Sequence, residues 1–365
     1  MLASDNLPAD RLVMHYLVDE NANTDETNNQ FAADVRRGLS STPKVLYPKY
    51  FYDELGSQLF DAICLLPEYY LTRAEEEILS QHADDIVHAA KSIDREGDGD
   101  APLALVEFGS GSAIKTQRII EAAFRVQSDL ALTSIDISAY ALERAARVLL
   151  QSYPGLRLTA LAGDYEAALN FLRHHQIEAQ HDATHTTARH DMTRPRTLAL
   201  FLGSNIGNFN YDEAIAFLHR LRTTLRAGDA LLLGADLRKD VKILEAAYDD
   251  ALGVTAAFNL NILNRINREL DGDFQLANFR HVARYDDGEG SVKIYIESAR
   301  EQTVRLAQLD MEIEFAEGER IHTENSHKYD HATLSAMAHE TGFRLAQTWH
   351  DHAAQFSSNL FVAVA

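Results

Sequence analysis

The 365-residue sequence predicts an α/β fold, in which a mostly parallel, doubly wound sheet is combined with an additional α+β unit. An apolar run at Leu103–Phe108 leads into a glycine-bracketed turn and then into a helical pattern. Further apolar runs alternate with helical segments, which is typical of parallel strands joined by helices. After Asp236 the pattern changes to long helices and to polar–apolar alternation, which is typical of antiparallel strands.

Composition and charge exclude several classes of protein. A net charge of -21 argues against a nucleic-acid partner, because binding phosphates requires a concentrated basic surface. The single cysteine, Cys64, excludes an internal disulfide framework and a cysteine-built metal site, and we expect no metal. The N-terminus lacks the pattern of a signal peptide, and no run of about 18 apolar residues occurs. We therefore expect a cytoplasmic monomer with no membrane segment.

The N-terminal quarter of the sequence, residues 1–91, precedes the predicted core. Residues 1–27 are polar and predict a mobile tail. Residues 28–91 predict helices and an extended segment, and we expect them to contribute to the additional unit. Within them, Thr72 and Glu75 have the spacing of a helix capping box.

Residues 92–237 carry the alternating core. We predict strands at Leu103–Phe108, Leu130–Ile137, Leu156–Ala162, Thr197–Leu202 and Ala230–Leu237. Helices are clearest at Ile114–Phe124, Ala139–Leu150 and Tyr211–Leu225. The insertion at 174–196 is rich in histidine, but the histidine spacing is irregular, so we expect a solvated loop rather than a metal site.

The C-terminal third predicts two further parts. Residues 238–327 combine helices with alternating runs, and we expect them to complete the additional α+β unit. Residues 328–365 predict a helix and a terminal hairpin, which would return to the core sheet and add an antiparallel strand.

The glycine turn at Gly109 and Gly111 fits two classes of ligand, dinucleotides and S-adenosylmethionine. The dinucleotide fingerprint requires a third glycine at the position of Ile114, so that site would be compromised. Acidic residues follow or end the first three core strands: Glu107, Asp136 and Asp164. Asp136 suits ribose hydroxyls, and Asp164 with Tyr165 suits an adenine amine and ring. Together with the terminal hairpin, this arrangement favours a Rossmann-like, seven-stranded sheet of the S-adenosylmethionine-dependent methyltransferases.

Longer motifs make the sequence resemble a specific family. They are FYDELGSQLFDAICLLPEYYLTRAEEEIL, EFGSGSAIKTQ, FLGSNIGNFN, LLGADLRKD, AYDDALGVTAAFNLNILNRINREL and GERIHTENSHKY. With them, nearly everything from Ser41 to the end, apart from the histidine-rich insertion, resembles the histidine N-alpha-methyltransferases of ergothioneine biosynthesis. The resemblance implies an enzyme that trimethylates the α-amine of L-histidine to hercynine, and a substrate domain built from the N-terminal region and a mid-chain insertion. A fungal branch of the family acts on a prenylated tryptophan.

The resemblance also implies site residues. It assigns the cofactor to Gly109, Lys115, Asp136, Asp164 and Tyr165, with the Lys115 ammonium meeting the methionyl carboxylate. It assigns the substrate to Phe60, Tyr69, Asn208, Tyr248, Ile294, Glu324 and Ser326, with Tyr248 bonding the substrate carboxylate. Our hypothesis for catalysis is that Tyr52 and Asn208 position the neutral amine without a dedicated general base, so the rate should climb with pH toward the pKa of the amine.

Substrate preference depends on Glu324 and Ser326, which are two residues apart in an extended segment and so face the same way. A carboxylate and a hydroxyl together match an imidazole, which offers one donor and one acceptor nitrogen. An indole has no acceptor nitrogen and would leave a polar group unsatisfied, at a cost of about 1–3 kcal/mol. This favours histidine over tryptophan.

Three positions depart from the family pattern, and two rival functions remain open. Ile294 stands where methionine is frequent, Tyr165 where phenylalanine is common and Asn205 where threonine is usual. These changes affect the prediction of the exact substrate and leave the predicted reaction unchanged. The rivals are an N-methyltransferase for another amino acid, such as tryptophan or a histidine derivative, and a protein that binds the cofactor without turnover.

Overall fold

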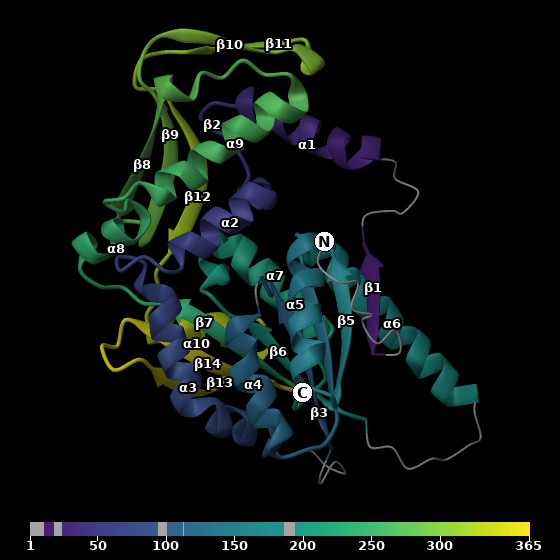
Figure 1. Ribbon diagram of the computed structural model, residues 1–365. Coiled ribbons are helices and arrows are strands. Elements are labelled where there is room, and N and C mark those ends of the chain that lie inside the picture. Colours follow the sequence, from purple (N-terminus) through teal and green to yellow (C-terminus); the bar gives the residue numbers. More distant parts are fainter. Residues whose placement is uncertain (1–10, 18–23, 94–100, 112, 186–193) are drawn as a thin grey trace. The chain divides into compact units, whose positions relative to one another are not determined.

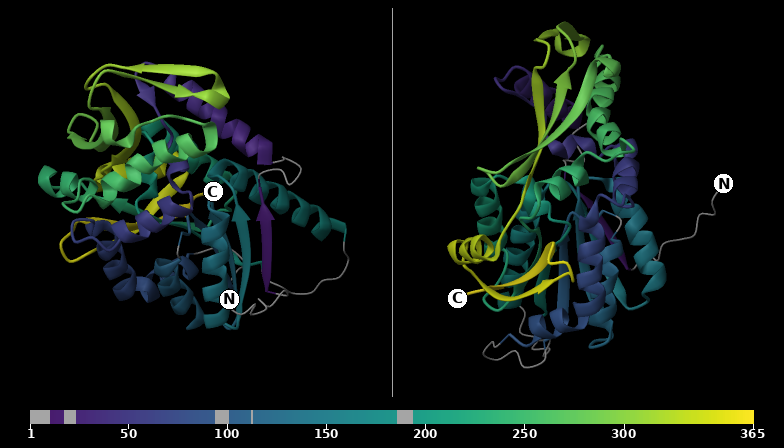
Figure 2. Two further views of the ribbon diagram at one scale, coloured as in Figure 1. Left: turned by 45° about the horizontal axis from the view of Figure 1, so that its top comes forward. Right: turned by 90° about the vertical axis from the view of Figure 1, so that its left-hand side faces the viewer.

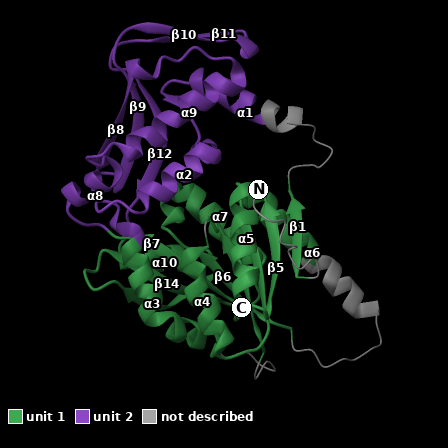
Figure 3. Ribbon diagram, viewed as in Figure 1, with its two compact units in different colours: residues 1–18, 73–237, 329–365 green, residues 19–72, 238–328 purple. Residues whose placement is uncertain are grey.

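The computed structural model describes residues 11–17, 24–93, 101–111, 113–185 and 194–365, without the side chains of 24–29 and 176–185. The chain forms two compact units (Figure 3). Unit 1 comprises residues 1–18, 73–237 and 329–365, and unit 2 comprises residues 19–72 and 238–328. Residues 28–91, which we expected to stay together, are therefore divided after residue 72.

Unit 1 is built on one sheet of eight strands in the order β1-β5-β4-β3-β6-β7-β14-β13 (Figure 1). The strands are β1 Leu12–Tyr16, β3 Leu103–Phe108, β4 Leu130–Asp136, β5 Leu156–Ala162, β6 Arg196–Phe201, β7 Ala230–Asp236, β13 Phe343–His350 and β14 Phe356–Ala363. The predicted doubly wound fold is confirmed: β1 and β3–β7 run parallel, and the terminal hairpin adds β14 antiparallel to β7. The order reverses between β3 and β6, and in sheets of this kind ligands bind at such a switch point.

The helices of unit 1 are α3 Tyr70–Lys91 (from residue 73), α4 Ile114–Phe124, α5 Ala139–Ser152, α6 Tyr165–His185, α7 Tyr211–Thr223 and α10 His331–Glu340, with a short helix η2 Asn205–Asn208. One core joins α6, α7 and α10 to the sheet, around side chains such as Phe201, Phe217 and Met337. On the opposite face, α3 pairs with α4 through Arg118–Glu76 and Arg125–Asp84. The views of Figure 2 agree with helices on both faces. This pairing explains why most of α3 belongs to unit 1.

Three local predictions in unit 1 are wrong. Within the expected N-terminal tail, Leu12–Tyr16 forms β1, whose run LVMHY pairs in parallel with β5 and makes an eighth strand; residues 1–10 and 18–23 of that tail lie outside the described residues. Much of the expected loop at 174–196 is helical, because α6 continues to His185; residues 186–193, which include His190, lie outside the described residues. No capping box forms at Thr72 and Glu75, because α3 begins at Tyr70 and Glu75 is fully buried elsewhere.

Unit 2 has a four-stranded sheet in the order β2-β12-β9-β8 and a separate hairpin, β10-β11. The strands are β2 Lys44–Val45, β8 Phe279–Asp286, β9 Ser291–Ser298, β10 Gln302–Leu306, β11 Met311–Phe315 and β12 Arg320–His327. The helices are α1 Thr24–Leu39, η1 Pro48–Phe51, α2 Glu54–Ile63, α8 Val241–Tyr248, α9 Val254–Leu270, η3 Leu276–Asn278 and η4 Ala307–Leu309. Helix α9 packs on strand β8 and on α2, so the N-terminal segment and the mid-chain insertion form one body.

Among the helices in the described part of the chain, none is both long enough and apolar enough to cross a membrane.

Candidate active site

The turn after β3 has the backbone geometry that its glycines predict. Gly109 and Gly111 have φ angles of 74° and 48°, which only glycine adopts at little cost. The amides of Gly109 and Ser110 donate to the Ile135 carbonyl at 2.8 and 3.1 Å, so this turn is fixed to the end of β4. The space where a Gly111 Cβ would stand has no neighbouring atom within 4 Å. A ligand therefore has open access to this part of the backbone.

Asp136 ends β4 beside the same turn. Its Oδ2 accepts from the Gly111 amide at 2.8 Å and its Oδ1 from the Ser138 amide at 2.9 Å. Burial raises the pKa of Asp136, although these backbone hydrogen bonds oppose that shift. The carboxylate has about four acceptor positions, which the amides of Gly111, Ser138 and Ile137 do not fill, so Asp136 can also accept from a ribose hydroxyl.

Asp164 and Tyr165 follow β5 and differ in exposure. Asp164 is exposed, and its Oδ1 accepts from the Ala167 amide at 2.9 Å, which caps α6. The Tyr165 ring packs against four phenylalanine rings: Phe108, Phe201, Phe209 and Phe217.

The space above Gly109 is filled by side chains from two other strand ends. A Cβ on Gly109 would lie 2.7 Å from the Tyr165 hydroxyl and 2.7 Å from Nδ2 of Asn205. Two of the three departures from the family pattern therefore lie against the glycine turn, and Gly109 is required there for close packing as well as for its φ angle.

Lys115 lies in the first turn of α4, and its ammonium pairs with Glu75 at 2.6 Å. Glu75 is fully buried, and its carboxylate also accepts from the Gly203 amide at 2.8 Å. A single carboxylate from α3 thus joins the loop after β6 to the helix after β3, on either side of the switch point. This role of Glu75 could not be predicted from the sequence, where its spacing from Thr72 indicated only a helix cap.

Glu107 lies deeper, near the end of β3, and is buried. Its Oε1 accepts from the Thr116 hydroxyl, and its Oε2 has no hydrogen-bond partner among the described residues. Burial raises the pKa of Glu107 to about 8. Of the three acids at the strand ends, this one is largely protonated at neutral pH.

Asn208 ends η2, directly after β6, and is partly buried. The described residues include no hydrogen-bond partner for its amide. The backbone around it is fixed, since the Tyr329 hydroxyl donates to the Ile206 carbonyl at 3.1 Å and the Ser204 hydroxyl accepts from the Asp236 amide at 3.0 Å. Asn208 is thus an available polar group on a rigid loop.

Unit 2 brings three of the predicted aromatic residues together. Phe60 on α2 contacts the rings of Tyr52 and Tyr69 at centroid distances of 5.7 and 6.2 Å. Phe258 on α9 completes the cluster, 5.7 Å from Tyr52 and 5.9 Å from Phe60. Phe258 could not be predicted as a site residue, because it lies within a helix whose apolar face is typical of ordinary core.

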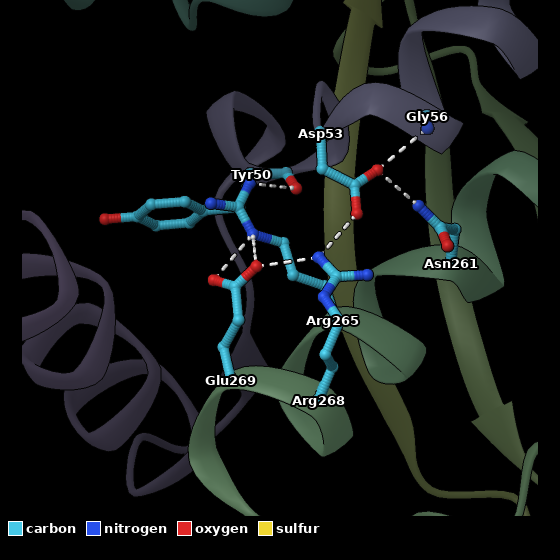
Figure 4. A network of polar contacts seen from close by, with 7 residues as sticks. All are labelled: Tyr50, Asp53, Gly56, Asn261, Arg265, Arg268 and Glu269. Carbon is cyan, nitrogen blue, oxygen red and sulfur yellow. Dashed lines mark hydrogen bonds and ion pairs between the residues drawn. The ribbon is translucent and has the colours of Figure 1, made fainter. Parts of the chain in front are cut away.

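A polar network fixes the start of α2 (Figure 4). Asp53 caps this helix by accepting from the Gly56 amide at 2.8 Å, and it also accepts from Asn261 and Arg268 of α9, each at 2.8 Å. Burial alone would raise the pKa of Asp53, but these hydrogen bonds, led by that of Arg268, leave it lowered. The network holds the adjacent Tyr52 and the helix that carries Phe60 against α9.

Tyr248, Ser326 and Lys328 form a second polar cluster in unit 2. The hydroxyls of Tyr248 and Ser326 share a hydrogen bond of 2.6 Å. The Lys328 ammonium donates to both oxygens, at 2.9 and 2.8 Å, and lies 4.7 Å from the centroid of the Tyr248 ring. All three residues are buried. Lys328 was not predicted, although its spacing of two residues from Ser326 places it on the same side of an extended chain.

Glu324 lies two residues before Ser326 and opposite Ile294 of β9. A bulge between His322 and Glu324 shifts the register there. The carboxylate has no hydrogen-bond partner among the described residues. Burial raises the pKa of Glu324 to about 7, and the charge of Lys328 opposes that shift. Ile294 is buried and presents an apolar wall.

His281 and Asn259 fix the C-terminal end of α8 by hydrogen bonds. The Nε2 of His281 lies 2.7 Å from the Tyr248 carbonyl, and its Nδ1 lies 2.9 Å from the Asn259 amide nitrogen. Donation by Nε2 to the carbonyl and acceptance by Nδ1 from the amide require a neutral ring. Burial lowers the pKa of His281, which agrees with that state.

The predicted residues thus gather in two groups. Gly109, Lys115, Asp136, Asp164, Tyr165 and Asn208 lie at the carboxyl ends of the unit 1 strands. Tyr52, Phe60, Tyr69, Tyr248, Ile294, Glu324 and Ser326 belong to unit 2. The unit 1 group fits the chemistry of S-adenosylmethionine, since the molecule offers a ribose diol to Asp136 and a carboxylate to a lysine.

Comparison with known proteins identifies the family. Residues 31–363 match the family described as "Histidine-specific methyltransferase, SAM-dependent". The chain belongs to this family. The histidine N-alpha-methyltransferase of Mycolicibacterium smegmatis is 40% identical over 329 residues, which are 90% of this chain and 94% of that protein. The protein of the same name from Mycobacterium tuberculosis is 37% identical over 90% of this chain and 93% of its own length.

More distant relatives extend the range of substrates. The L-tryptophan methyltransferase of Psilocybe serbica is 26% identical over 89% of this chain and 90% of its own length. The family membership makes this chain an S-adenosylmethionine-dependent methyltransferase, with S-adenosylmethionine as its cofactor.

Proposed function

We propose that this enzyme transfers three methyl groups to the α-amine of L-histidine and forms hercynine, the first step of ergothioneine biosynthesis. The observation that carries this proposal is the pairing of Glu324 and Ser326, which offers an acceptor and a hydroxyl from one side of β12. An imidazole ring can satisfy both groups, whereas an indole can satisfy only the carboxylate. The two relatives named for histidine N-alpha-methylation support the same substrate.

The donor supplies a methyl group on a sulfonium, and displacement from it disperses charge, so the protein contributes mainly alignment and exclusion of water. On the unit 1 side, Asp136 would hold the ribose and Lys115 the methionyl carboxylate. The Lys115–Glu75 ion pair does not exclude this role, because an ammonium has three donors and Glu75 uses one of them.

On the substrate side, we assign the ring to Glu324 and Ser326. We do not assign the substrate carboxylate to Tyr248, because its hydroxyl already shares a hydrogen bond with Ser326 and accepts one from Lys328. Phe60, with Phe258 beside it, would supply an apolar wall that tolerates an amine of growing bulk. We assign Tyr52 and Asn208 to the neutral amine. Since no strong base is assigned, the rate of methyl transfer should rise with pH toward the pKa of the amine.

The alternative substrate is a tryptophan-like amino acid. The feature of the sequence that favours this alternative is Ile294. A shorter, branched apolar side chain where methionine is frequent would change the shape of the space beside the ring. Glu324 and Ser326 oppose this alternative, since an indole would leave the hydroxyl without an acceptor, at a cost of about 1–3 kcal/mol.

A panel of amino acids separates these possibilities. The full-length enzyme is assayed with methyl-labelled S-adenosylmethionine and with histidine, N-methylated histidines, tryptophan and phenylalanine. We expect the highest kcat/KM for histidine and its methylated intermediates. Turnover of tryptophan above histidine would replace the proposed substrate, and tight binding of histidine without turnover of any amino acid would favour the non-enzymatic rival.

A further inference from the structure

Lys328 is a buried cation beside the residues assigned to the substrate ring, and neither the sequence motifs nor the proposed reaction gives it a role. It follows β12 directly, after Glu324 and Ser326 at spacings of two residues. Its ammonium contacts two hydroxyl oxygens and the face of the Tyr248 ring. A buried ammonium is costly to desolvate, so its retention in this position calls for an explanation.

The geometry constrains the hydroxyl protons. The Lys328 ammonium can only donate, so the oxygens of Ser326 and Tyr248 each use a lone pair on it. The two hydroxyls also share one hydrogen bond, for which one of them must donate. A phenol is the more acidic of the two, which favours donation from Tyr248 to Ser326. In that arrangement both lone pairs of Ser326 are occupied, and its own proton is directed to a ligand.

The same cation acts on Glu324. Its positive charge lowers the pKa of this carboxyl against the effect of burial. The other groups around Glu324 bring no positive charge: Tyr69 is buried with a strongly raised pKa, Tyr248 is a phenol, and Ile294 on the neighbouring strand is apolar. Lys328 is therefore the cation that the described structure places in electrostatic contact with Glu324.

We propose that Lys328 is a positioning residue for substrate recognition, which makes Ser326 a hydrogen-bond donor and provides the counter-charge of Glu324. This inference rests on the proposed function, since it takes histidine as the ligand of that pair. The resulting site has one fixed acceptor and one fixed donor, which matches a neutral imidazole with one N–H and one free lone pair. It disfavours an imidazolium, which has no lone pair for Ser326 and is repelled by the ammonium.

The test compares Lys328→Met, which keeps the length of the side chain without its charge, with Lys328→Arg, which keeps charge and donors. Lys239→Met is a matched control, because Lys239 in the same unit also donates to a tyrosine hydroxyl, that of Tyr70 at 2.6 Å, and lies 4.4 Å from its ring centroid. Thermal unfolding and S-adenosylmethionine binding verify that each variant is folded. If Lys328→Met does not fold, Lys328→Gln takes its place.

Two measurements test the proposal on these variants. The first is histidine turnover between pH 6 and 10. At pH 7 we expect Lys328→Met to raise KM about ten- to a hundredfold, which is the effect of losing a hydrogen bond to a charged group. Its kcat at saturation should change much less. The acid limb of kcat/KM that belongs to Glu324, which lies below the rise caused by deprotonation of the amine, should move about one pH unit higher as the carboxyl loses its counter-charge. Lys328→Arg should keep the acid limb in place, and Lys239→Met should leave it unchanged.

The second measurement needs no substrate. Titration of the glutamate carboxyl carbons by NMR, with Glu324→Gln to assign the signal, should show a higher pKa for Glu324 in Lys328→Met than in the wild type. An equal pKa and an unmoved acid limb in Lys328→Met would overturn the proposal, as would an arginine variant that behaves like the methionine variant. If the wild type does not methylate histidine at all, the proposed function fails, and the Glu324 titration still decides the role of Lys328.

Discussion

The two units present their functional groups in different ways. Unit 1 offers backbone amides, a glycine turn and carboxylates, all placed where consecutive parallel strands end. Unit 2 offers side chains from α2, α8, α9 and β12, which are up to about 270 residues apart in the chain and converge only in three dimensions. The first arrangement suits a ligand shared by many enzymes, and the second suits a ligand that must be distinguished from similar ones.

The comparison implies that substitutions in unit 2 should change substrate recognition without changing cofactor affinity. Replacing Glu324 by alanine should lower kcat/KM for histidine about a hundredfold, because a charged hydrogen bond to the ring is lost. The dissociation constant of S-adenosylmethionine, measured by calorimetry, should stay within about twofold of the wild type. Parallel loss of both affinities would contradict the separation of tasks.

A substitution at Glu75 tests the framework of unit 1. Glu75→Gln leaves the Lys115 ammonium without its carboxylate, and breaking a buried ion pair in this way costs about 3–5 kcal/mol. Since Lys115 is partly exposed, we expect a loss near the lower end, measured as the free energy of unfolding in urea. The matched control is Asp84→Asn, which breaks an exposed ion pair of the same helix and should cost less than about 1 kcal/mol. Equal effects would show that Glu75 does not anchor α3 at the switch point.

The two glycines of the turn should differ in sensitivity. Gly109→Ala would place a Cβ 2.7 Å from Tyr165 and Asn205 atoms, whereas Gly111→Ala meets no atom within 4 Å. Both changes carry the cost of a left-handed backbone, about 1–2 kcal/mol. We expect Gly109→Ala to weaken S-adenosylmethionine binding at least tenfold more than Gly111→Ala does. The reverse order, found by calorimetry, would mean that the ligand itself fills the space above Gly111.

A further expected effect concerns Glu107, the buried acid near the end of β3. Its pKa is raised by burial from an ordinary 4.5 to about 8, so the folded state binds this proton more tightly than the unfolded state. The free energy of unfolding should therefore fall as pH rises from about 4.5 to 8. Glu107→Gln removes this proton and should flatten that part of the profile. An unchanged slope in urea unfolding at several pH values would argue that other groups cause it.

Much of unit 1 could be predicted because its determinants are local in sequence. The strands at Leu103–Phe108 and Leu156–Ala162 and the helix at Ile114–Phe124 have the predicted bounds, since apolar runs and helical periodicity define them directly. The strand Leu12–Tyr16 was missed because it is a short edge strand in a polar region, and it becomes stable only by pairing with β5. The helical part of the histidine-rich insertion lacked an apolar periodicity that would identify it.

The residues of the candidate site differ in the same way, since some could be predicted from local sequence and others could not. Gly109, Asp136 and Asp164 could be located from strand ends alone, and the residues of unit 2 required the resemblance to a family. Glu75, Phe258 and Lys328 could not be found by either route. Their roles depend on partners more than 40 residues away in most cases, such as the Gly203 amide for Glu75 and the Tyr248 hydroxyl for Lys328.

The most direct test of the account is tandem mass spectrometry of the product formed by the full-length enzyme from L-histidine and methyl-deuterated S-adenosylmethionine. We expect three labelled methyl groups on one nitrogen, released together as labelled trimethylamine from the α-carbon. Label on the imidazole ring, or labelled product from tryptophan but not from histidine, would contradict it.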